Sequence, residues 1–584
     1  MRRPVIVFAS TLAVSLSPFL AGMAQGQSPA AATVEVTKRP YGDVIRLLDT
    51  WLEAELAYSR VRGFSAAVVV GPELVWSKGY GTIDIGRKVL AAPNTIYSVC
   101  SISKLFTSIA VMQLWEAGKL SLDDDVARYL PGFGIRRSDP DSGPITIRSL
   151  LTHSSGLPRE SEFPYWTGPD FKFPTRQEML GMLADQATLM RASDRYQYSN
   201  LAMSLLGEVV VSVAGVPYDT YVRNNILSPL GLSDTRTVMP MELYGRQLAQ
   251  GFGAVKRDGS RDLLKPFDAA GITAAAGYTS TVQDLAKFAS WQFRLLKNGG
   301  TEVLRVSTLR EMQRVQWTDA DGKNTRGLGF GVRKDGATTV VSHSGSCPGY
   351  LSGLALVPKD ELAIIAMTNG NGGDDEIAHF TKPMRQLMAK GLKLTPAPIG
   401  PGSPDLEAYA GKYDFQPWAS EGAVVPWGSR LAVIDLPNPD PAGRSGCFST
   451  WPATPSVRFA MMTAWPRRGS SSAARTAASC GSERTGNLKT GSLSERVLVE
   501  RQRFGPYGFV PNQLSRTASG CERLTISPDC RYSALSKRAA RSRSSAGHEA
   551  ISCRLAACGR SRSIAALSTL LAGSDATSSP GATR

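Results

Sequence analysis

Histidine is scarce in this chain of 584 residues. The four histidines are His153, His343, His379 and His548, and none is spaced as a ligand pair with another histidine, a thiol or a carboxylate. Because bound metals need such ligand sets, we predict no metal, and no motif calls for another cofactor.

Long apolar runs are also missing after the first residues, so we predict no membrane span. The N-terminal stretch "MRRPVIVFASTLAVSLSPFLAGMAQGQS" has two arginines, an apolar run broken by Pro18, and the small residues Gly22 and Ala24 in the spacing of a signal peptidase site. This pattern predicts a signal peptide over residues 1–24 and a periplasmic or secreted protein. A membrane anchor is the alternative, but the run is short and Pro18 interrupts it.

Net charge is nearly absent from the first 440 residues, which carry 45 Lys and Arg against 43 Asp and Glu. Residues 441–584 carry 21 against 7, together with six of the eight cysteines. We predict that the Arg/Ser/Ala-rich tail, 444–584, is disordered or the product of a shifted reading frame. A nucleic-acid-binding arm is the alternative, but no aromatic side chains interleave its scattered arginines, so we predict no nucleic-acid partner.

The length allows two to four domains. Residues 63–81 read as two β-rich runs joined by Gly71-Pro72, and residues 350–369 as two more that turn through residues 358–360. Between them, apolar residues recur at helical spacing, as in Leu105, Ile109 and Met112. We therefore predict an α+β domain over residues 45–394, in which one antiparallel sheet is assembled from both ends of the segment and packs against an all-helical insertion.

The Pro/Gly-rich segment 395–404 predicts a linker. Short strand-like runs resume over residues 405–443, as if a small β-barrel-like domain were starting and were left incomplete.

The stretch "YSVCSISKLFTSIAVMQLWEAGKL" places Ser101 and Lys104 three residues apart at the opening of a helix. This spacing puts the hydroxyl and the amine on one face, where a partly dehydrated lysine can activate the serine as a nucleophile. Alone, Ser-x-x-Lys is weak evidence, because Ser101 could simply cap the helix.

The stretch "RYQYSNLAMSLLG" supplies Tyr198 and Asn200. Lowering a tyrosine pKa from 10 to about 7 takes roughly 4 kcal/mol, which a cation ~4 Å away in a shielded site can supply. We expect Lys104 to have this effect on Tyr198, and Asn200 to hold Lys104 and a substrate amide oxygen. Alternatively, the two residues merely begin a helix.

With "SHSGSCPGY" at 342–350, the chain shows Ser-x-x-Lys, Tyr-x-Asn and His-x-Gly in that order, and so resembles the serine β-lactamase and penicillin-binding-protein superfamily. "LLTHSSGLP" at 150–158, "AAGYTSTVQDLAKFA" at 275–289 and "GLGFGV" at 327–332 resemble the same family. The likeness covers about residues 45–372. Residues 405–443 resemble the start of the lipocalin-like barrel that some members append.

The resemblance implies roles for individual residues. Ser101 is the acylated nucleophile, Lys104 its activator, and Tyr198 the general base and then the acid to the leaving group. Asn200 binds substrate. His343, Ser344 and Gly345 lie on the strand that lines the cleft, and the N–H groups of Ser101 and Ser346 form the oxyanion hole. His153 is expected to be a structural turn residue.

His343 stands where β-lactamases and transpeptidases usually have a lysine. With no glutamate assignable to deacylation, the chain is more similar to class C enzymes, D-aminopeptidases and esterases. We therefore predict an exported serine hydrolase acting through an acyl-enzyme on small amides, esters or D-amino-acid peptides. The alternatives are a true β-lactamase, with a β-lactam as substrate, and a catalytically silent cell-wall-binding module. His343 itself could be only a hydrogen-bonding spacer. The sequence makes no prediction of the oligomeric state.

In this family the start of the nucleophile helix and the His-x-Gly strand face each other across the cleft. Cys100 precedes the predicted nucleophile, and Cys347 follows Gly345 by two residues. The resemblance therefore implies a disulfide between them, with two buried thiols as the alternative.

Overall fold

The computed structural model describes residues 41–371, 376–394, 405–414, 416 and 420–442, and the backbone of residues 450–452 and 465–466. The predicted signal peptide, the 395–404 linker and nearly all of the 444–584 tail lie outside the described residues.

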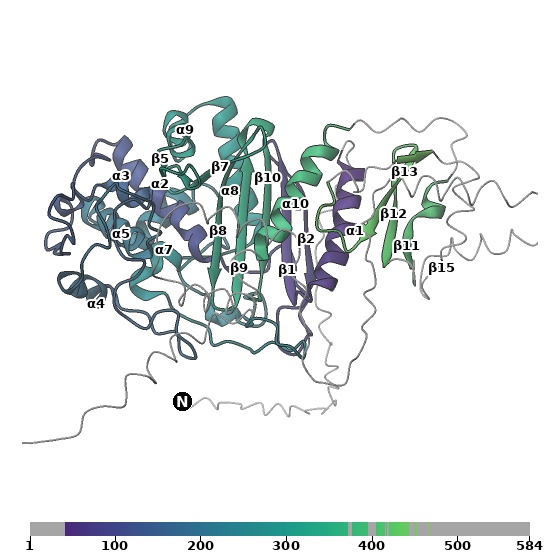
Figure 1. Cartoon of the computed structure of the whole chain (residues 1–584), viewed down its shortest axis with the longest axis horizontal. Coiled ribbons are helices and arrows are strands. Elements are labelled where there is room, and N and C mark those ends of the chain that lie inside the picture. Colours follow the sequence, from purple (N-terminus) through teal and green to yellow (C-terminus); the bar gives the residue numbers. More distant parts are fainter. Residues whose placement is uncertain are drawn as a thin grey trace, which may run out of the picture. The chain divides into compact units, whose positions relative to one another are not determined.

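An eight-stranded antiparallel sheet forms the centre of the first domain, in the order β2-β1-β10-β9-β8-β7-β6-β5 (Figure 1). Phe64 of β1 pairs with Thr368 of β10, so strands from the two ends of the domain lie side by side. The strands of this sheet are β1 (Gly63–Val70), β2 (Glu73–Gly81), β5 (Trp317–Thr318), β6 (Thr325–Arg326), β7 (Gly331–Asp335), β8 (Thr338–Cys347), β9 (Tyr350–Val357) and β10 (Leu362–Thr368). Two further strands, β3 (Tyr97–Ser98) and β4 (Thr279–Ser280), form a separate two-stranded sheet.

Helices cover both faces of this sheet. Helix α8 packs on one face and α10 on the other, and α3, α4 and α6 pack against other helices. The α-helices of the described residues are α1 (Gly42–Tyr58), α2 (Ser103–Glu116), α3 (Ile147–Leu151), α4 (Arg176–Gly181), α5 (Asn200–Ala214), α6 (Tyr218–Val222), α7 (Thr273–Ala276), α8 (Val282–Asn298), α9 (Val306–Gln313) and α10 (Glu376–Gly391). The predicted α+β class and the antiparallel sheet flanked by helices are confirmed.

The alternation of side chains along β1 explains why both faces are covered. Ala67 and Val69 join a buried cluster with α2, α5 and α8, whereas Ala66 and Val68 join another with α1 and α10. Because successive strand residues point to opposite faces, a strand that is apolar at every position needs a layer on each side. β1 is close to such a strand: Ser65 is its one polar side chain, and seven of its eight residues are buried.

A second sheet follows, in the order β14-β13-β12-β11-β15. Val425 and Trp427 belong to the same buried cluster as Trp51 of α1, whose indole N–H donates to Asn438 O at 2.8 Å. The two shortest strands lie within the segment predicted as tail, and the lipocalin-like identity of this sheet stays a prediction. Its strands are β11 (Gly411–Asp414), β12 (Glu421–Trp427), β13 (Arg430–Leu436), β14 (Thr450–Pro452) and β15 (Trp465–Pro466).

Within the described residues, no single helix has both the length and the apolar composition of a membrane span. The α5 helix and the segment Tyr218–Leu227 meet these criteria only as a pair, which is bent by 79°.

Candidate active site

Ser101 lies in a single 3-10 turn, η1 (Cys100–Ile102), that leads into α2. Cys100 has a φ of 50°, an unusual conformation for a residue other than glycine. The next turn is tied down because Ser103 Oγ accepts from the N–H of Tyr278 at 3.0 Å. The N-cap of α2 is Ile102, so Ser101 is not the helix cap that its position alone allowed.

Lys104 is completely buried beside Ser101. Its Nζ lies 3.1 Å from Ser101 Oγ, 2.6 Å from Asn200 Oδ1 and 2.9 Å from the carbonyl oxygen of Ala275. Ser101 lies in η1, Asn200 is the first residue of α5, and Ala275 lies in α7, so three separate elements fix the amine.

Burial lowers the pKa of Lys104 to about 7, because the surroundings solvate an ammonium poorly. The negative charge of Glu160 opposes this shift and the positive charge of Arg159 adds to it. The amine therefore changes protonation state near neutral pH.

Tyr198 donates its hydroxyl proton to Ser101 Oγ at 2.8 Å. Burial raises the pKa of Tyr198 to about 12, although the hydrogen bond to Ser101 and the charge of Arg159 oppose the rise. The expectation that Lys104 brings this pKa to about 7 is wrong. The physical reason is that the buried lysine loses its own charge near neutral pH, so the desolvation of the phenolate is not compensated.

The ring of His153 lies against Tyr198, with the two ring centroids 4.5 Å apart. His153 has a φ of 58°, and its Nδ1 accepts from the N–H of Ser199 at 3.2 Å. Burial is the main cause that lowers its pKa well below the usual range. His153 thus occupies a turn and supports the segment that carries Tyr198.

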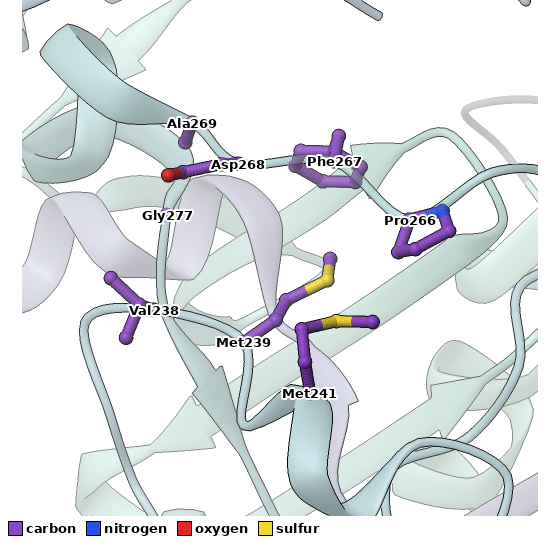
Figure 2. Close-up of a pocket in the computed structure, with 8 residues that line it drawn as sticks. All are labelled: Val238, Met239, Met241, Pro266, Phe267, Asp268, Ala269 and Gly277. Carbon is purple, nitrogen blue, oxygen red and sulfur yellow. The ribbon is translucent and has the colours of Figure 1, made fainter. Parts of the chain in front are cut away.

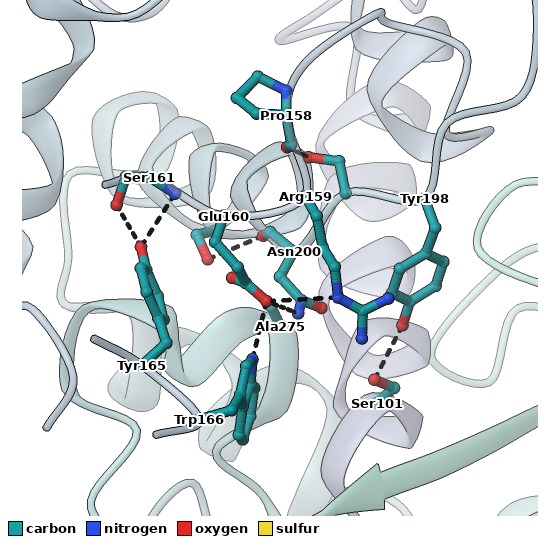
Figure 3. Close-up of polar contacts among 12 residues, drawn as sticks. Ser101, Pro158, Arg159, Glu160, Ser161, Tyr165, Trp166, Tyr198, Asn200 and Ala275 are labelled. Carbon is teal, nitrogen blue, oxygen red and sulfur yellow. Dashed lines mark hydrogen bonds and ion pairs between the residues drawn. The ribbon is translucent and has the colours of Figure 1, made fainter. Parts of the chain in front are cut away.

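Glu160 is a site residue that sequence reasoning missed. Its Oε1 accepts from Asn200 Nδ2 at 2.5 Å and from Trp166 Nε1 at 2.8 Å, as Figure 3 shows. Burial raises its pKa above the usual range. Because Oε1 can only accept here, Asn200 turns its NH2 group toward Glu160 and its oxygen toward Lys104. The one available signal is its place, three residues after Leu157 of the "THSSGL" stretch.

His343 lies on β8 and is almost fully buried. Its Nδ1 donates to the carbonyl oxygen of Ser344 at 2.7 Å, and its Nε2 has no partner among the described residues. Burial and the charge of Lys104 lower its pKa to about 3, so the imidazole is neutral at physiological pH.

The β8 strand leaves a free edge at the site. Its pairing with β7 ends at Ser342, whereas its pairing with β9 continues to Cys347. Residues of β8 alternate between buried and exposed, and Ser344 and Ser346 are exposed. Gly345 permits the close approach of β8 to η1, because a Cβ at this position would lie 2.1 Å from the carbonyl oxygen of Val99.

A disulfide joins Cys100 to Cys347 across this approach, with 5.8 Å between the two Cα atoms. It links the turn that carries Ser101 to the end of β8, so covalent and steric constraints act on the same contact.

A cavity of about 270 Å³ opens on another part of the domain (Figure 2). None of the predicted site residues lines it. Its walls are Val238, Met239, Met241, Pro266, Phe267, Asp268, Ala269 and Gly277.

The fold and this cluster define a class of protein, the β-lactamase and penicillin-binding-protein type of domain. The family described as Beta-lactamase matches residues 48–382, more than half of the chain. The chain therefore belongs to the beta-lactamase family.

Two curated relatives illustrate the range of this family. Beta-lactamase-like protein 2 of Dictyostelium discoideum is 30% identical over 304 residues, which are 51% of this chain and 54% of the relative. The D-alanyl-D-alanine-carboxypeptidase/endopeptidase AmpH of Escherichia coli (strain K12) is 27% identical over 335 residues, 55% of this chain and 83% of the relative. The chain thus spans only about half the length of the first relative.

Solved structures share the fold. The octameric penicillin-binding protein homologue from Pyrococcus abyssi has a TM-score of 0.52 and 24% identity, covering 70% of this chain and 89% of the homologue. The D-amino acid amidase from Ochrobactrum anthropi SV3 has a TM-score of 0.50 and 23% identity, covering 60% of this chain and 99% of the amidase.

Proposed function

We propose that this protein is an exported serine hydrolase that forms an acyl-enzyme on Ser101 with small amides, esters or D-amino-acid peptides. Family membership supports the hydrolase class. The similarity to a D-alanyl-D-alanine-carboxypeptidase/endopeptidase and to a D-amino acid amidase supports peptides and amides as the substrate class.

The observation that carries the proposal is the set of partners around Lys104 Nζ. A neutral amine has two N–H donors and one lone pair. Asn200 Oδ1 and the carbonyl oxygen of Ala275 can only accept, so they take the two N–H groups. The lone pair is then left for the hydroxyl of Ser101, which is the arrangement that a general base requires.

Acylation follows from this arrangement. Lys104 thus takes the general-base role that the resemblance implied for Tyr198, whose pKa of about 12 keeps it protonated. Ser101 Oγ attacks the carbonyl carbon while its proton passes to Lys104 Nζ, and the carbonyl oxygen becomes negative. The N–H groups of Ser101 and Ser346 are proposed to stabilise this oxyanion. Tyr198 is protonated near neutral pH because its pKa is about 12. It gives its proton to the leaving group and regains one from the Lys104 ammonium.

Deacylation reverses these transfers with water. Water attacks the acyl carbon, its proton passes to the Tyr198–Lys104 pair, and Ser101 Oγ leaves and takes a proton back. In this scheme Asn200 holds the amine and contacts the substrate, and the neutral His343 lines the cleft together with Ser344 and Gly345.

Covalent labelling tests the proposal. A fluorophosphonate probe and a fluorescent penicillin are incubated with the wild type and with Ser101→Ala, and adducts are located by peptide mass spectrometry. We expect an adduct on Ser101 with at least one probe and none in the variant. Ser260→Ala, which removes an exposed loop serine, is the matched control and should label normally. The absence of any adduct with both probes would overturn the enzyme proposal in favour of a silent binding module.

Two parts of the proposal concern other segments. We propose that residues 1–24 direct export, and that the second sheet begins a lipocalin-like domain. The amino-terminal sequence of the protein recovered from the periplasm or medium tests the first of these.

A further inference from the structure

Arg159 extends its guanidinium into the network around Ser101. Figure 3 shows the group between the amide of Asn200 and the ring of Tyr198. Its Cζ lies 5.1 Å from the centroid of the Tyr198 ring, and the side chain is 59% exposed. A fixed positive charge is thus open to solvent beside the tyrosine that contacts Ser101.

The backbone of Arg159 is held in place. Its carbonyl oxygen accepts from the N–H groups of Asn200 and Leu201 at 2.8 and 3.1 Å, which ties the residue to the first turn of α5. Ser199 Oγ also donates to the carbonyl oxygen of Pro158 at 2.7 Å. The side chain therefore starts from a fixed point at the edge of the site.

Most of the hydrogen-bonding capacity of Arg159 is unused. Its Nε lies 3.7 Å from Glu160 Oε1, an oxygen that already accepts from Asn200 and Trp166. Within the described part of the chain, neither Nη atom of Arg159 makes a hydrogen bond. By contrast, Arg326 donates to the hydroxyl of Tyr196. A guanidinium with two free Nη groups is suited to bidentate binding of a carboxylate.

We propose that Arg159 binds a carboxylate of the substrate and so determines specificity for anionic acyl compounds. The inference rests on the proposed hydrolase function. His343, at the position where the resemblance implies a lysine in β-lactamases and transpeptidases, is neutral and offers only an acceptor at Nε2. Arg159 supplies the permanent charge from the segment between α3 and α4, instead of from β8.

Matched substrate pairs test this inference. In one pair, phenylacetylglycine is esterified to 3-hydroxybenzoic acid or to 3-hydroxybenzamide, so the carboxylate lies on the leaving group. In the other, 4-carboxyphenylacetic or 4-carbamoylphenylacetic acid is esterified to phenol, so the carboxylate lies on the acyl group. Rates are measured at pH 8.5, because Arg159 lowers the pKa of Lys104 and its loss would change the protonation of Lys104 near pH 7.

We expect the wild type to prefer the carboxylate member of at least one pair by about tenfold or more in kcat/KM, in line with the usual strength of charged hydrogen bonds. Arg159→Gln should lose this preference, mainly through KM, while the carbamoyl substrates change by less than about threefold. Arg159→Lys should retain part of the preference, because lysine keeps the positive charge but lacks the paired N–H donors of the guanidinium. The control is Arg195→Gln, which removes an exposed arginine paired with Asp194.

Labelling of Ser101 by the uncharged fluorophosphonate probe separates two failures. If neither the wild type nor the variants are labelled and no ester is cleaved, the hydrolase proposal itself fails. If all are labelled at similar rates, but the wild type shows no preference or Arg159→Gln retains it, the role of Arg159 is refuted and the hydrolase proposal stands. A probe-labelling rate in Arg159→Gln close to that of the wild type also shows that the variant is folded.

Discussion

Buried side chains at the site have protonation states set mainly by loss of water. Burial brings the pKa of Lys104 down to about 7 and takes that of Tyr198 up to about 12. Both shifts favour the uncharged form, which is the expected effect of a poorly solvating environment. The site therefore holds a neutral amine and a neutral phenol around one hydroxyl, and Glu160 is the nearby group that resists the loss of charge on Lys104.

Glu160→Gln is expected to shift the pH dependence of acylation. Its negative charge raises the pKa of Lys104, so its removal lowers that pKa and leaves more neutral amine at low pH. The acid limb of kcat/KM, near pH 7 in the wild type, should move to lower pH, while the alkaline plateau stays within a few fold. The amide oxygen of glutamine can still accept from Asn200, so the network keeps its geometry.

The pH–rate profile with an uncharged ester provides the measurement. Glu162→Gln, which neutralises an exposed carboxylate two residues along, is the control and should leave the profile in place. An unchanged or raised apparent pKa in Glu160→Gln would show that Glu160 contributes through its hydrogen bonds and not through its charge.

The resemblance carried by the three motifs predicted that Ser101, Lys104, Tyr198 and Asn200 form one site, and the structure brings these four residues together. The sequence did not predict the raised pKa of Tyr198 or the contacts of Glu160. Both depend on how deeply a loop buries its side chains, and loop burial leaves no periodic trace in a sequence.

At the scale of elements, the site depends on how closely β8 approaches η1. A Cβ on residue 345 would lie 2.1 Å from Val99 O and 2.4 Å from Ser352 Oγ, so no side chain fits between them. The same approach sets the distance between the free edge of β8 and Ser101. The packing of β8 against η1 therefore requires glycine at this position of the His-x-Gly motif, independently of any contact with substrate.

Gly345→Ala should therefore destabilise the protein by about 1–3 kcal/mol and slow labelling of Ser101, because β8 must move away from η1 to admit the methyl group. Urea unfolding gives the first effect and probe kinetics the second. Gly143→Ala is the control, since a Cβ there meets nothing within 4 Å. Wild-type stability in Gly345→Ala would mean that the strand and the turn have room to separate.

The elements themselves were the most predictable part of the fold. The apolar runs of β1 and β10 and the helical spacing of Leu105, Ile109 and Met112 correspond to buried positions. The order of the strands was foreseen only in outline. The small strands β5 and β6, two residues each, are too short to produce a pattern.

For the molecule as a whole, the Cys100–Cys347 disulfide closes a loop with a sequence separation of 247 residues. In the chain-entropy treatment such a loop corresponds to about 5 kcal/mol, and measured effects are commonly 2–5 kcal/mol. Replacing both cysteines by serine should lower the urea midpoint accordingly. Alkylation without reductant, followed by peptide mapping, checks the bond directly, and modification of both cysteines under those conditions would contradict it.

The pairing of β1 with β10 also has a consequence during synthesis. Roughly 300 residues separate Phe64 from its partner Thr368, so at 5–20 residues per second the ribosome needs about 15–60 s to deliver the second strand. For that time the β1–β2 hairpin has emerged with an apolar edge and no neighbour. A nascent chain of this design is expected to need a holding chaperone, which selective ribosome profiling of chaperone-bound chains would reveal as engagement that begins once β1 has emerged and ends after β10.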